Sequence, residues 1–316
     1  MQQILLGSGG AKVDPIYVDN LFSTYLFKGN GSYPRTITNG IDFSGEDGLV
    51  IHKSRSDDYG WVAYDTIRGA GAKAVRIDGM QGENSSNVAP YALLDQFNNN
   101  GFRLNQPTST DVLNGNNLET ASFSFRKASG FLDIVSYSGD GTTTGRAINH
   151  GLKSKPGFII VKRLDSGGSN AYRQWFCYHD ALPDTYQIKL SSSDPKQTNG
   201  NDVFGTGSSF VRPDSTQFTV GEFINFSGGS YVAYLFGGGE SDAATARSVG
   251  FSSSSTYLSI PDSNDFDFGS TFTFEAWVKP EFHSGGNNLI FEHGSFQIAI
   301  TDAGLLNFDL NHIHIG

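Results

Sequence analysis

The stretch Gly48–Lys53, GLVIHK, returns about 110 residues later as Gly157–Lys162, GFIIVK. Each copy is a short apolar run that ends in a lysine, which is typical of a buried β-strand. A period this long exceeds the roughly 20–50 residues of a solenoid repeat and indicates tandem domains of one fold. The pair therefore predicts a duplicated β domain.

Five further pairs accompany this one, in the same order along the chain. They are TYLFKGNG at 24–31 with IVSYSGDG at 134–141, RTITNG at 35–40 with RAINHG at 146–151, Tyr64-Asp65 with Tyr178-His179-Asp180, GFRL at 101–104 with QFTV at 217–220, and ASFSF at 121–125 with VAYLF at 232–236. Short strands broken by Gly-rich turns, without helical periodicity, predict a β-sandwich in each unit. We expect Leu49–Ile51 and Phe158–Val161 in the cores. In the closing strands we expect one buried face, carrying Phe123 and Phe125 or Tyr234 and Phe236.

The composition agrees with an all-β chain. The 316 residues include 39 Gly, 25 Phe and 13 Tyr but only 2 Met, which suits strands and turns better than long helices. A net charge of −10 argues against nucleic acid as a partner, since phosphate binding needs a basic surface. The longest apolar run, Phe158–Val161, is far shorter than a membrane span, so we expect no membrane insertion.

The duplication and the turn-rich stretches between strands predict the domain boundaries. We expect an N-terminal segment at 1–20, repeat 1 at 21–127, repeat 2 at 128–239 and a linker at 240–248, where GGGESDAA reads as flexible. The joint at 126–130 is very short, so the relative orientation of the repeats is expected to be fixed. Residues 249–316 form a further β segment.

The segment from 249 onward contains YLSIP at 257–261 and FTFEAWV at 272–278, where Phe272, Phe274, Ala276 and Val278 alternate with polar or larger residues. These motifs resemble the laminin-G-like, concanavalin-A-like lectin sandwich. The resemblance implies a jelly-roll sandwich of which about 68 residues are present here. Because half a sandwich would leave open edges, we expect the natural protein to continue beyond residue 316.

The repeats resemble units found in tail-fibre and other virion proteins of phages, especially those infecting marine cyanobacteria. The phrases that carry this resemblance are VDNLFSTYL at 18–26, FSFRKASGF at 123–131 and YVAYLF at 231–236. The resemblance implies a structural role and localisation in the virion tail, after synthesis in the host cytoplasm. It supplies no catalytic residues.

The residues Ile4, Leu5 and Leu6 form an apolar triplet near the N-terminus. We interpret the triplet as a plug that docks into a partner protein of the virion, because exposed apolar clusters mark interaction sites. Packing within the protein's own trimer is the equal alternative. The following glycines at 7, 9 and 10 do not match a phosphate-binding loop in spacing or context.

No catalytic constellation is recognisable, and the chain is predicted not to be an enzyme. His150, His179 and Asp180 lack a Gly-x-Ser-x-Gly nucleophile and are interpreted as surface residues. Cys177, the single cysteine, lies in an aromatic strand and is interpreted as a buried inert thiol.

No metal site or cofactor is predicted. The acidic groups at Asp57-Asp58 and at Asp262, Asp265 and Asp267 read as solvated loops rather than calcium ligands. His312 and His314 alternate on one strand face, which is weak evidence for a metal.

These observations predict a phage tail fibre or similar virion component. It would attach through its N-terminus to other tail proteins, form a homotrimer, and present a distal domain to a host-surface glycan or receptor. A carbohydrate-binding adhesin without catalysis is the alternative. A polysaccharide depolymerase is disfavoured, because no carboxylate pair and no β-helix repeat is evident.

Overall fold

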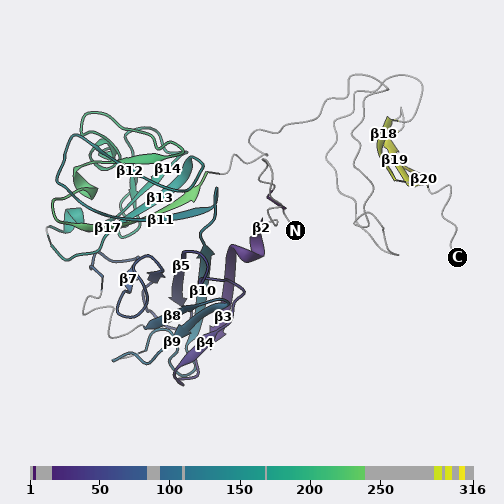
Figure 1. Cartoon of the computed structure of the whole chain (residues 1–316), viewed down its shortest axis with the longest axis horizontal. Coiled ribbons are helices and arrows are strands. Elements are labelled where there is room, and N and C mark those ends of the chain that lie inside the picture. Colours follow the sequence, from purple (N-terminus) through teal and green to yellow (C-terminus); the bar gives the residue numbers. More distant parts are fainter. Residues whose placement is uncertain are drawn as a thin grey trace. The chain divides into compact units, whose positions relative to one another are not determined.

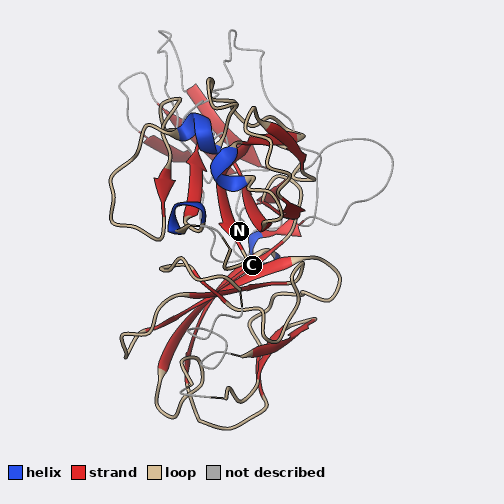
Figure 2. Cartoon of the chain, turned by 90° about the vertical axis from the view of Figure 1, so that its left-hand side faces the viewer, coloured by secondary structure: helices blue, strands red, loops and turns tan. Residues whose placement is uncertain are grey.

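A computed structural model of the chain describes residues 3–4, 16–83, 93–108, 111–167, 169–238, 288–293, 296–300 and 306–309, and β-strands dominate them (Figures 1 and 2). The predicted all-β sandwich class is confirmed. The chain divides into one compact unit at Met1–Arg247 and a second at Ser248–Gly316. No helix among the described residues is long and apolar enough to span a membrane.

Repeat 1 consists of a five-stranded and a three-stranded antiparallel sheet. The larger sheet has the order β3 (Phe22–Lys28), β10 (Glu119–Arg126), β5 (Gly48–Ser54), β6 (Val62–Asp65) and β7 (Val75–Arg76). The smaller sheet has the order β4 (Arg35–Ile37), β9 (Gly101–Leu104) and β8 (Leu94–Asn98).

Repeat 2 has the same strand order. Its larger sheet runs β11 (Leu132–Ser138), β17 (Ser230–Gly237), β13 (Pro156–Arg163), β14 (Trp175–His179) and β15 (Ile188–Lys189). Its smaller sheet contains β12 (Arg146–Asn149) and β16 (Gln217–Val220). The short helices η2 (Asn170–Tyr172), α1 (Gly200–Val203) and η3 (Glu222–Ile224) lie in its loops.

All six sequence pairs fall on equivalent strands of the two repeats. The register agrees residue by residue, since Ile51 pairs with Phe123 in repeat 1 and Ile160 pairs with Tyr234 in repeat 2. The duplication seen in the sequence is therefore a duplication of strand order and register.

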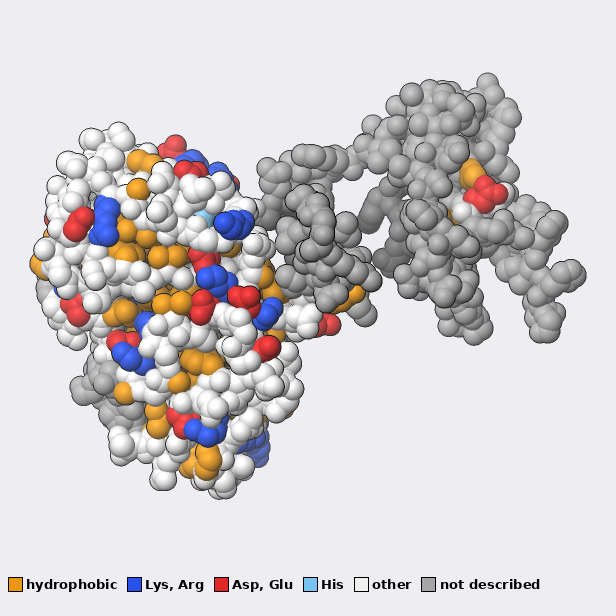
Figure 3. All heavy atoms as spheres, viewed as in Figure 1, with side chains coloured by type: hydrophobic (Ala, Val, Ile, Leu, Met, Phe, Trp, Pro, Cys, Tyr) orange, Lys and Arg blue, Asp and Glu red, His pale blue; other side chains and the backbone are white. Residues whose placement is uncertain are grey.

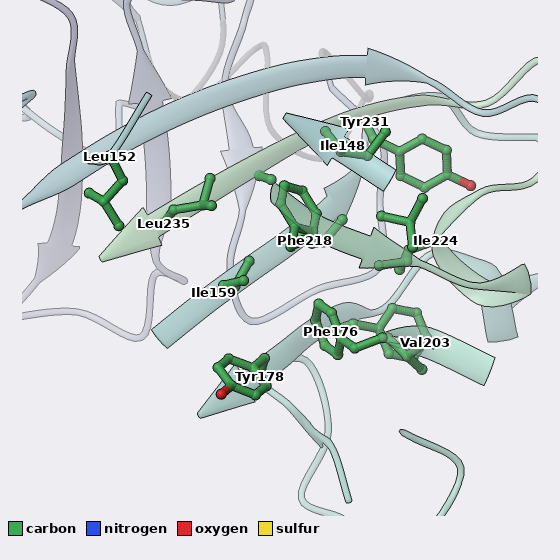
Figure 4. Packing of buried hydrophobic residues seen from close by; sticks show 14 residues of the cluster. Ile148, Leu152, Ile159, Phe176, Tyr178, Val203, Phe218, Ile224, Tyr231 and Leu235 are labelled. Atoms are coloured by element: carbon green, nitrogen blue, oxygen red, sulfur yellow. The ribbon is translucent and has the colours of Figure 1, made fainter. Parts of the chain in front are cut away.

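Each repeat encloses its own core between its two sheets. Val50, Tyr64 and Phe102 are fully buried in repeat 1. The repeat 2 core, in Figure 4, is built by Ile148, Leu152, Ile159, Phe176, Tyr178, Val203, Phe218, Ile224, Tyr231 and Leu235. Burying one large apolar side chain stabilises a fold by about 1.5–3 kcal/mol, so these clusters supply most of the stabilisation of each sandwich.

The closing strands differ from their prediction. In β10 the face with Thr120, Ser122 and Ser124 is almost fully buried, whereas Phe123 and Phe125 are only partly buried. In β17 residues on both faces are buried. One buried face was the wrong expectation, because the outer face of each large sheet is also used in packing.

Repeat 1 and repeat 2 each contain a buried asparagine that organises a glycine turn. The Asn225 side chain donates to Asp140 Oδ1 at 2.7 Å and to the Thr142 carbonyl at 3.0 Å, and its backbone carbonyl accepts from Gly141 at 2.8 Å. Asn114 makes the equivalent bonds to Asn30, Ser32 and Gly31.

The glycine at the start of each turn is required by a close backbone approach. A Cβ on Gly29 would lie 2.0 Å from the Gly115 carbonyl oxygen, and one on Gly139 would lie 2.1 Å from that of Phe226. Any other residue would therefore push the turn away from the asparagine loop.

The N-terminal and C-terminal segments add small sheets. Strand β1 (Gln3–Ile4) pairs with β2 (Ile16–Tyr17), which leads into η1 (Val18–Asn20). In the second unit β18 (Asn288–His293), β19 (Phe296–Ile300) and β20 (Leu306–Asp309) form an antiparallel meander. The lectin-like motifs at 257–261 and 272–278 lie outside the described residues.

One position in the repeat 1 core carries a histidine where repeat 2 has an apolar residue. His52 is fully buried between the rings of Tyr64 and Phe102, and neither of its ring nitrogens has a hydrogen-bond partner among the described residues. Burial lowers the pKa of His52 from 6.5 to about 3. Ser122, opposite it on β10, is also buried without a side-chain partner.

We predict that His52 makes stability depend on pH. Because its pKa is lower in the folded chain, the unfolded chain takes up the proton first as the pH falls below about 6.5. Between pH 7 and pH 5 this should remove about 2 kcal/mol of unfolding free energy. Urea unfolding should show that His52→Val, which installs the repeat 2 residue type, loses this component. Ser122→Ala, a control without a titratable change, should keep it; equal pH slopes for wild type and His52→Val would contradict the prediction.

Candidate functional site

The outer faces of the two large sheets pack against each other and form a third apolar core. Repeat 1 contributes Leu49, Ala63 and Val75, and repeat 2 contributes Leu132, Ile134, Ile160, Trp175, Cys177, Val232 and Tyr234, all buried. Phe125 and Phe236 meet edge to face across the interface at 5.6 Å. The two repeats are therefore joined through a continuous hydrophobic interior.

A charged network is buried within this apolar contact. Arg68 forms an ion pair with Asp65, and a second one with Glu83 at 3.1 Å. From repeat 2, the Tyr234 hydroxyl donates to Asp65 Oδ2 at 2.6 Å and lies 3.4 Å from Arg68 Nη2. Burial raises the pKa of Tyr234 well above its usual value, so the hydroxyl keeps its proton and remains a donor.

Hydrogen bonds to backbone carbonyls join the two repeats at two other places in the same interface. Trp175 Nε1 donates to the Arg76 carbonyl at 2.7 Å, and the Glu83 N–H donates to the Leu164 carbonyl at 2.6 Å. Hydrogen bonds require a particular distance and angle, so they form in one relative position of the two sheets. Apolar contacts can form in several.

The short joint between the repeats is held by charges as well. Lys127 lies 2.9 Å from Asp133 of repeat 2 and 3.4 Å from Asp47 of repeat 1. At the joint between β10 and β11, the Lys127 ammonium group therefore lies between a carboxylate of repeat 1 and a carboxylate of repeat 2.

A lysine occupies the same position in each repeat and donates to a backbone carbonyl of the following loop. Lys162 Nζ donates to the Arg173 carbonyl at 2.6 Å and lies 5.6 Å from the centre of the Trp175 ring. Burial lowers the pKa of Lys162 to about 7. Lys53 donates to the Tyr59 carbonyl in the equivalent place.

The candidate residues named from the sequence do not form one site, and each has its own surroundings. His150 and His179 are each used by a turn, where their Nδ1 atoms accept from the N–H groups of Leu152 at 3.3 Å and Ala181 at 3.1 Å. The predicted burial of Cys177 is confirmed, and burial raises the pKa of its thiol to about 12.

Of the N-terminal triplet, Ile4 lies in β1 opposite Ile16, while Leu5 and Leu6 lie outside the described residues. Docking of this triplet stays a prediction. Asp262, Asp265, Asp267, His312 and His314 also lie outside the described residues. Within the part of the chain that the structure describes, no group of three His, Cys, Asp or Glu side chains could hold a metal.

A shallow polar hollow of about 480 Å³ lies on the small sheet of repeat 1. Its lining includes Thr36 and Thr38 from the β4 side, and Gln96 and Asn98 from β8. Gly101 of β9 pairs with Asn98, and a Cβ on Gly101 would lie 2.0 Å from the Ile37 carbonyl oxygen. Neutral amides and hydroxyls of this kind can hydrogen-bond a polyhydroxylated ligand.

The interface network was missed at the level of sequence. Tyr64-Asp65 was recognised as part of the duplication, but Arg68 and Glu83 have no counterpart that marks them. The register places His179, not Asp180, opposite Phe158 where Asp65 stands opposite Leu49. The position is acidic in repeat 1, as Asp65, but not in repeat 2, where His179 stands. This difference was the feature of the sequence that could have pointed to the network.

Residues 18–278 match the model of a family described as a domain of unknown function, DUF7483. The chain belongs to this family. The matched range spans both repeats, in agreement with their shared core. No curated protein and no solved structure matches the chain.

We predict that Tyr234→Phe lowers the free energy of unfolding by about 1–3 kcal/mol, because Asp65 loses a buried donor. Arg68→Met should cost about 3–5 kcal/mol, because it leaves buried carboxylates without their cation. Urea unfolding of the whole chain measures both. Tyr25→Phe, at an exposed position, is the matched control, and a loss no larger than in this control would refute a structural role for the network.

Proposed function

We propose that the chain is a structural, non-catalytic component of a bacteriophage virion, specifically the particle-proximal portion of a tail fibre. The observation that carries the proposal is the interface between the repeats. A contact that combines an apolar core with buried ion pairs makes a body of fixed geometry, which suits a spacer that sets reach and angle.

The resemblance of the repeats to phage virion units supports the same role. In this proposal the N-terminal segment, with Ile4, Leu5 and Leu6, attaches to other tail proteins, and three chains form a homotrimer. The distal lectin-like domain contacts a host-surface glycan or receptor. The face seen in Figure 3 interleaves acidic and basic side chains with apolar ones, which suits a soluble scaffold better than nucleic-acid binding.

We predict that antibodies raised against residues 21–239 label the tail of intact particles in negative-stain electron microscopy. Labelling should cluster near the tail rather than on the capsid, because these residues form the particle-proximal body. Absence of the protein from purified particles, measured by mass spectrometry, would rule out the proposal. Antibodies against the capsid serve as the positional control.

A carbohydrate-binding module is a second candidate, favoured by the hollow beside Gln96 and Asn98. We predict that a glycan array would then give a signal for the chain that Thr38→Ala combined with Gln96→Ala weakens about tenfold or more, since each lost hydrogen bond contributes about 0.5–1.5 kcal/mol. Gln217→Ala in repeat 2 is the control. A signal unchanged by the double variant would exclude this hollow as the binding site.

A further inference from the structure

The chain contains five Asn–Gly pairs, the dipeptide at which asparagine deamidates most readily. They are Asn30-Gly31, Asn39-Gly40, Asn100-Gly101, Asn114-Gly115 and Asn199-Gly200. In this reaction the glycine nitrogen gives up its proton and bonds to the asparagine Cγ. The side-chain amide leaves as ammonia with that proton, and water opens the resulting succinimide ring to aspartate or isoaspartate. Glycine favours the reaction because it has no Cβ to shield the nitrogen or restrict the backbone.

In three of the pairs a backbone carbonyl accepts a hydrogen bond from the glycine N–H. The acceptors are Asn114 for Gly31 at 2.9 Å, Ile41 for Gly101 at 2.7 Å and Thr185 for Gly200 at 2.7 Å. The nitrogen has to leave this bond before it can lose its proton and turn toward the asparagine Cγ. The hydrogen bond therefore raises the barrier to deamidation at these three pairs.

The pair Asn114-Gly115 is protected on the asparagine side. Asn114 is fully buried. Its Oδ1 accepts from Arg35 Nη1 at 2.6 Å, and its Nδ2 donates to the Ser32 carbonyl at 3.0 Å. A fully buried amide has no contact with the water that opens the succinimide ring, so the fold protects this pair as well.

The pair Asn39-Gly40 depends on a single exposed side chain. The Gly40 N–H donates to Asn100 Oδ1 at 2.8 Å, and Asn100 lies exposed in the turn between β8 and β9. Asn39 itself is anchored, since its Nδ2 donates to Ser124 Oγ at 2.7 Å. An exposed side chain changes rotamer rapidly, whereas a backbone carbonyl moves only with its chain segment. The Gly40 nitrogen is therefore released more often than the other hydrogen-bonded glycine nitrogens.

We propose that the fold protects the chain from deamidation, and that Asn39 is the site at which the folded chain deamidates first. Repeat 2 has His150 at the position of Asn39 and Asp140 at the position of Asn30, and neither residue can deamidate. At these two positions repeat 2 avoids the reaction through its sequence, whereas repeat 1 depends on its hydrogen bonds. The inference goes beyond the proposed virion role. It would serve that role by keeping intact a chain that an assembled particle cannot replace.

The test compares the folded chain with the same chain unfolded in urea, both kept in warm, mildly alkaline buffer. Peptide mass spectrometry follows the gain in mass at each asparagine over time. The unfolded chain should deamidate at all five pairs. In the folded chain Asn39 should react first, and the other four should react more than about tenfold slower than when unfolded. Equal rates in the two states, or a first reaction at another asparagine, would overturn the proposal.

A pair of variants tests the role of the Asn100 side chain. Asn100→Ala removes the acceptor of the Gly40 N–H, so Asn39 should deamidate about twofold to tenfold faster in the folded chain. Asn99→Ala, at the neighbouring exposed residue, is the matched control and should leave the rate at Asn39 unchanged. Circular dichroism verifies that both variants are folded. An unchanged rate at Asn39 in Asn100→Ala contradicts the proposal.

A third variant separates hydrogen bonding from folding as the source of protection. Asp78 is exposed and precedes Gly79, whose N–H has no hydrogen-bond partner among the described residues. Asp78→Asn therefore creates an Asn–Gly pair with a free glycine nitrogen, and it should deamidate faster than Asn39 in the folded chain. A slower reaction there than at Asn39 would mean that the glycine hydrogen bonds do not decide the rates, which overturns the proposal. None of these results affects particle labelling, which tests the virion role separately.

Discussion

The structure depends on one constraint: both faces of each five-stranded sheet are apolar and need a cover. The inner face is covered by the small sheet of the same repeat. The outer face is covered by the other repeat, completely around Trp175 and Tyr234 of repeat 2 and in part on repeat 1. Strands β13 and β17 consequently have buried residues on both sides. Repeat 2 on its own would expose the face with Ile160 and Tyr234 to water. The two sandwiches are therefore expected to fold as one unit. The family match spans both of them.

The two repeats share the polar side chains that hold their loops, and they differ in polar side chains of the repeat 1 core and of the interface. Both repeats keep the asparagine that ties down the glycine turn and the lysine that donates to the next loop. They diverge at His52, which faces Ser122 where repeat 2 pairs Val161 with Ala233. They also diverge at Asp65, which anchors Tyr234 where repeat 2 has His179. The divergence at Asp65 makes the contact between the two sandwiches asymmetric.

This asymmetry links the proposed roles. A scaffold needs a fixed internal geometry, and the asymmetric contact between the two repeats supports one. Buried ion pairs add little net stability but exclude alternative packings, so the Arg68 network sets the angle between repeats. Trp61 on the outer face of repeat 1 and the hollow on the small sheet of repeat 1 remain exposed.

The sequence by itself determined the all-β class, the duplication and the burial of Cys177, because alternation, turn residues and internal repetition can be recognised without tertiary contacts. Only the tertiary structure decided which face of β10 is inward, which of two equivalent tryptophans is covered, and that Asp65, Arg68, Glu83 and Tyr234 meet. These outcomes depend on contacts between residues such as Asp65 and Tyr234, which are 169 positions apart. These residues meet because one sheet packs on the other. No local sequence pattern in either repeat predicts that packing.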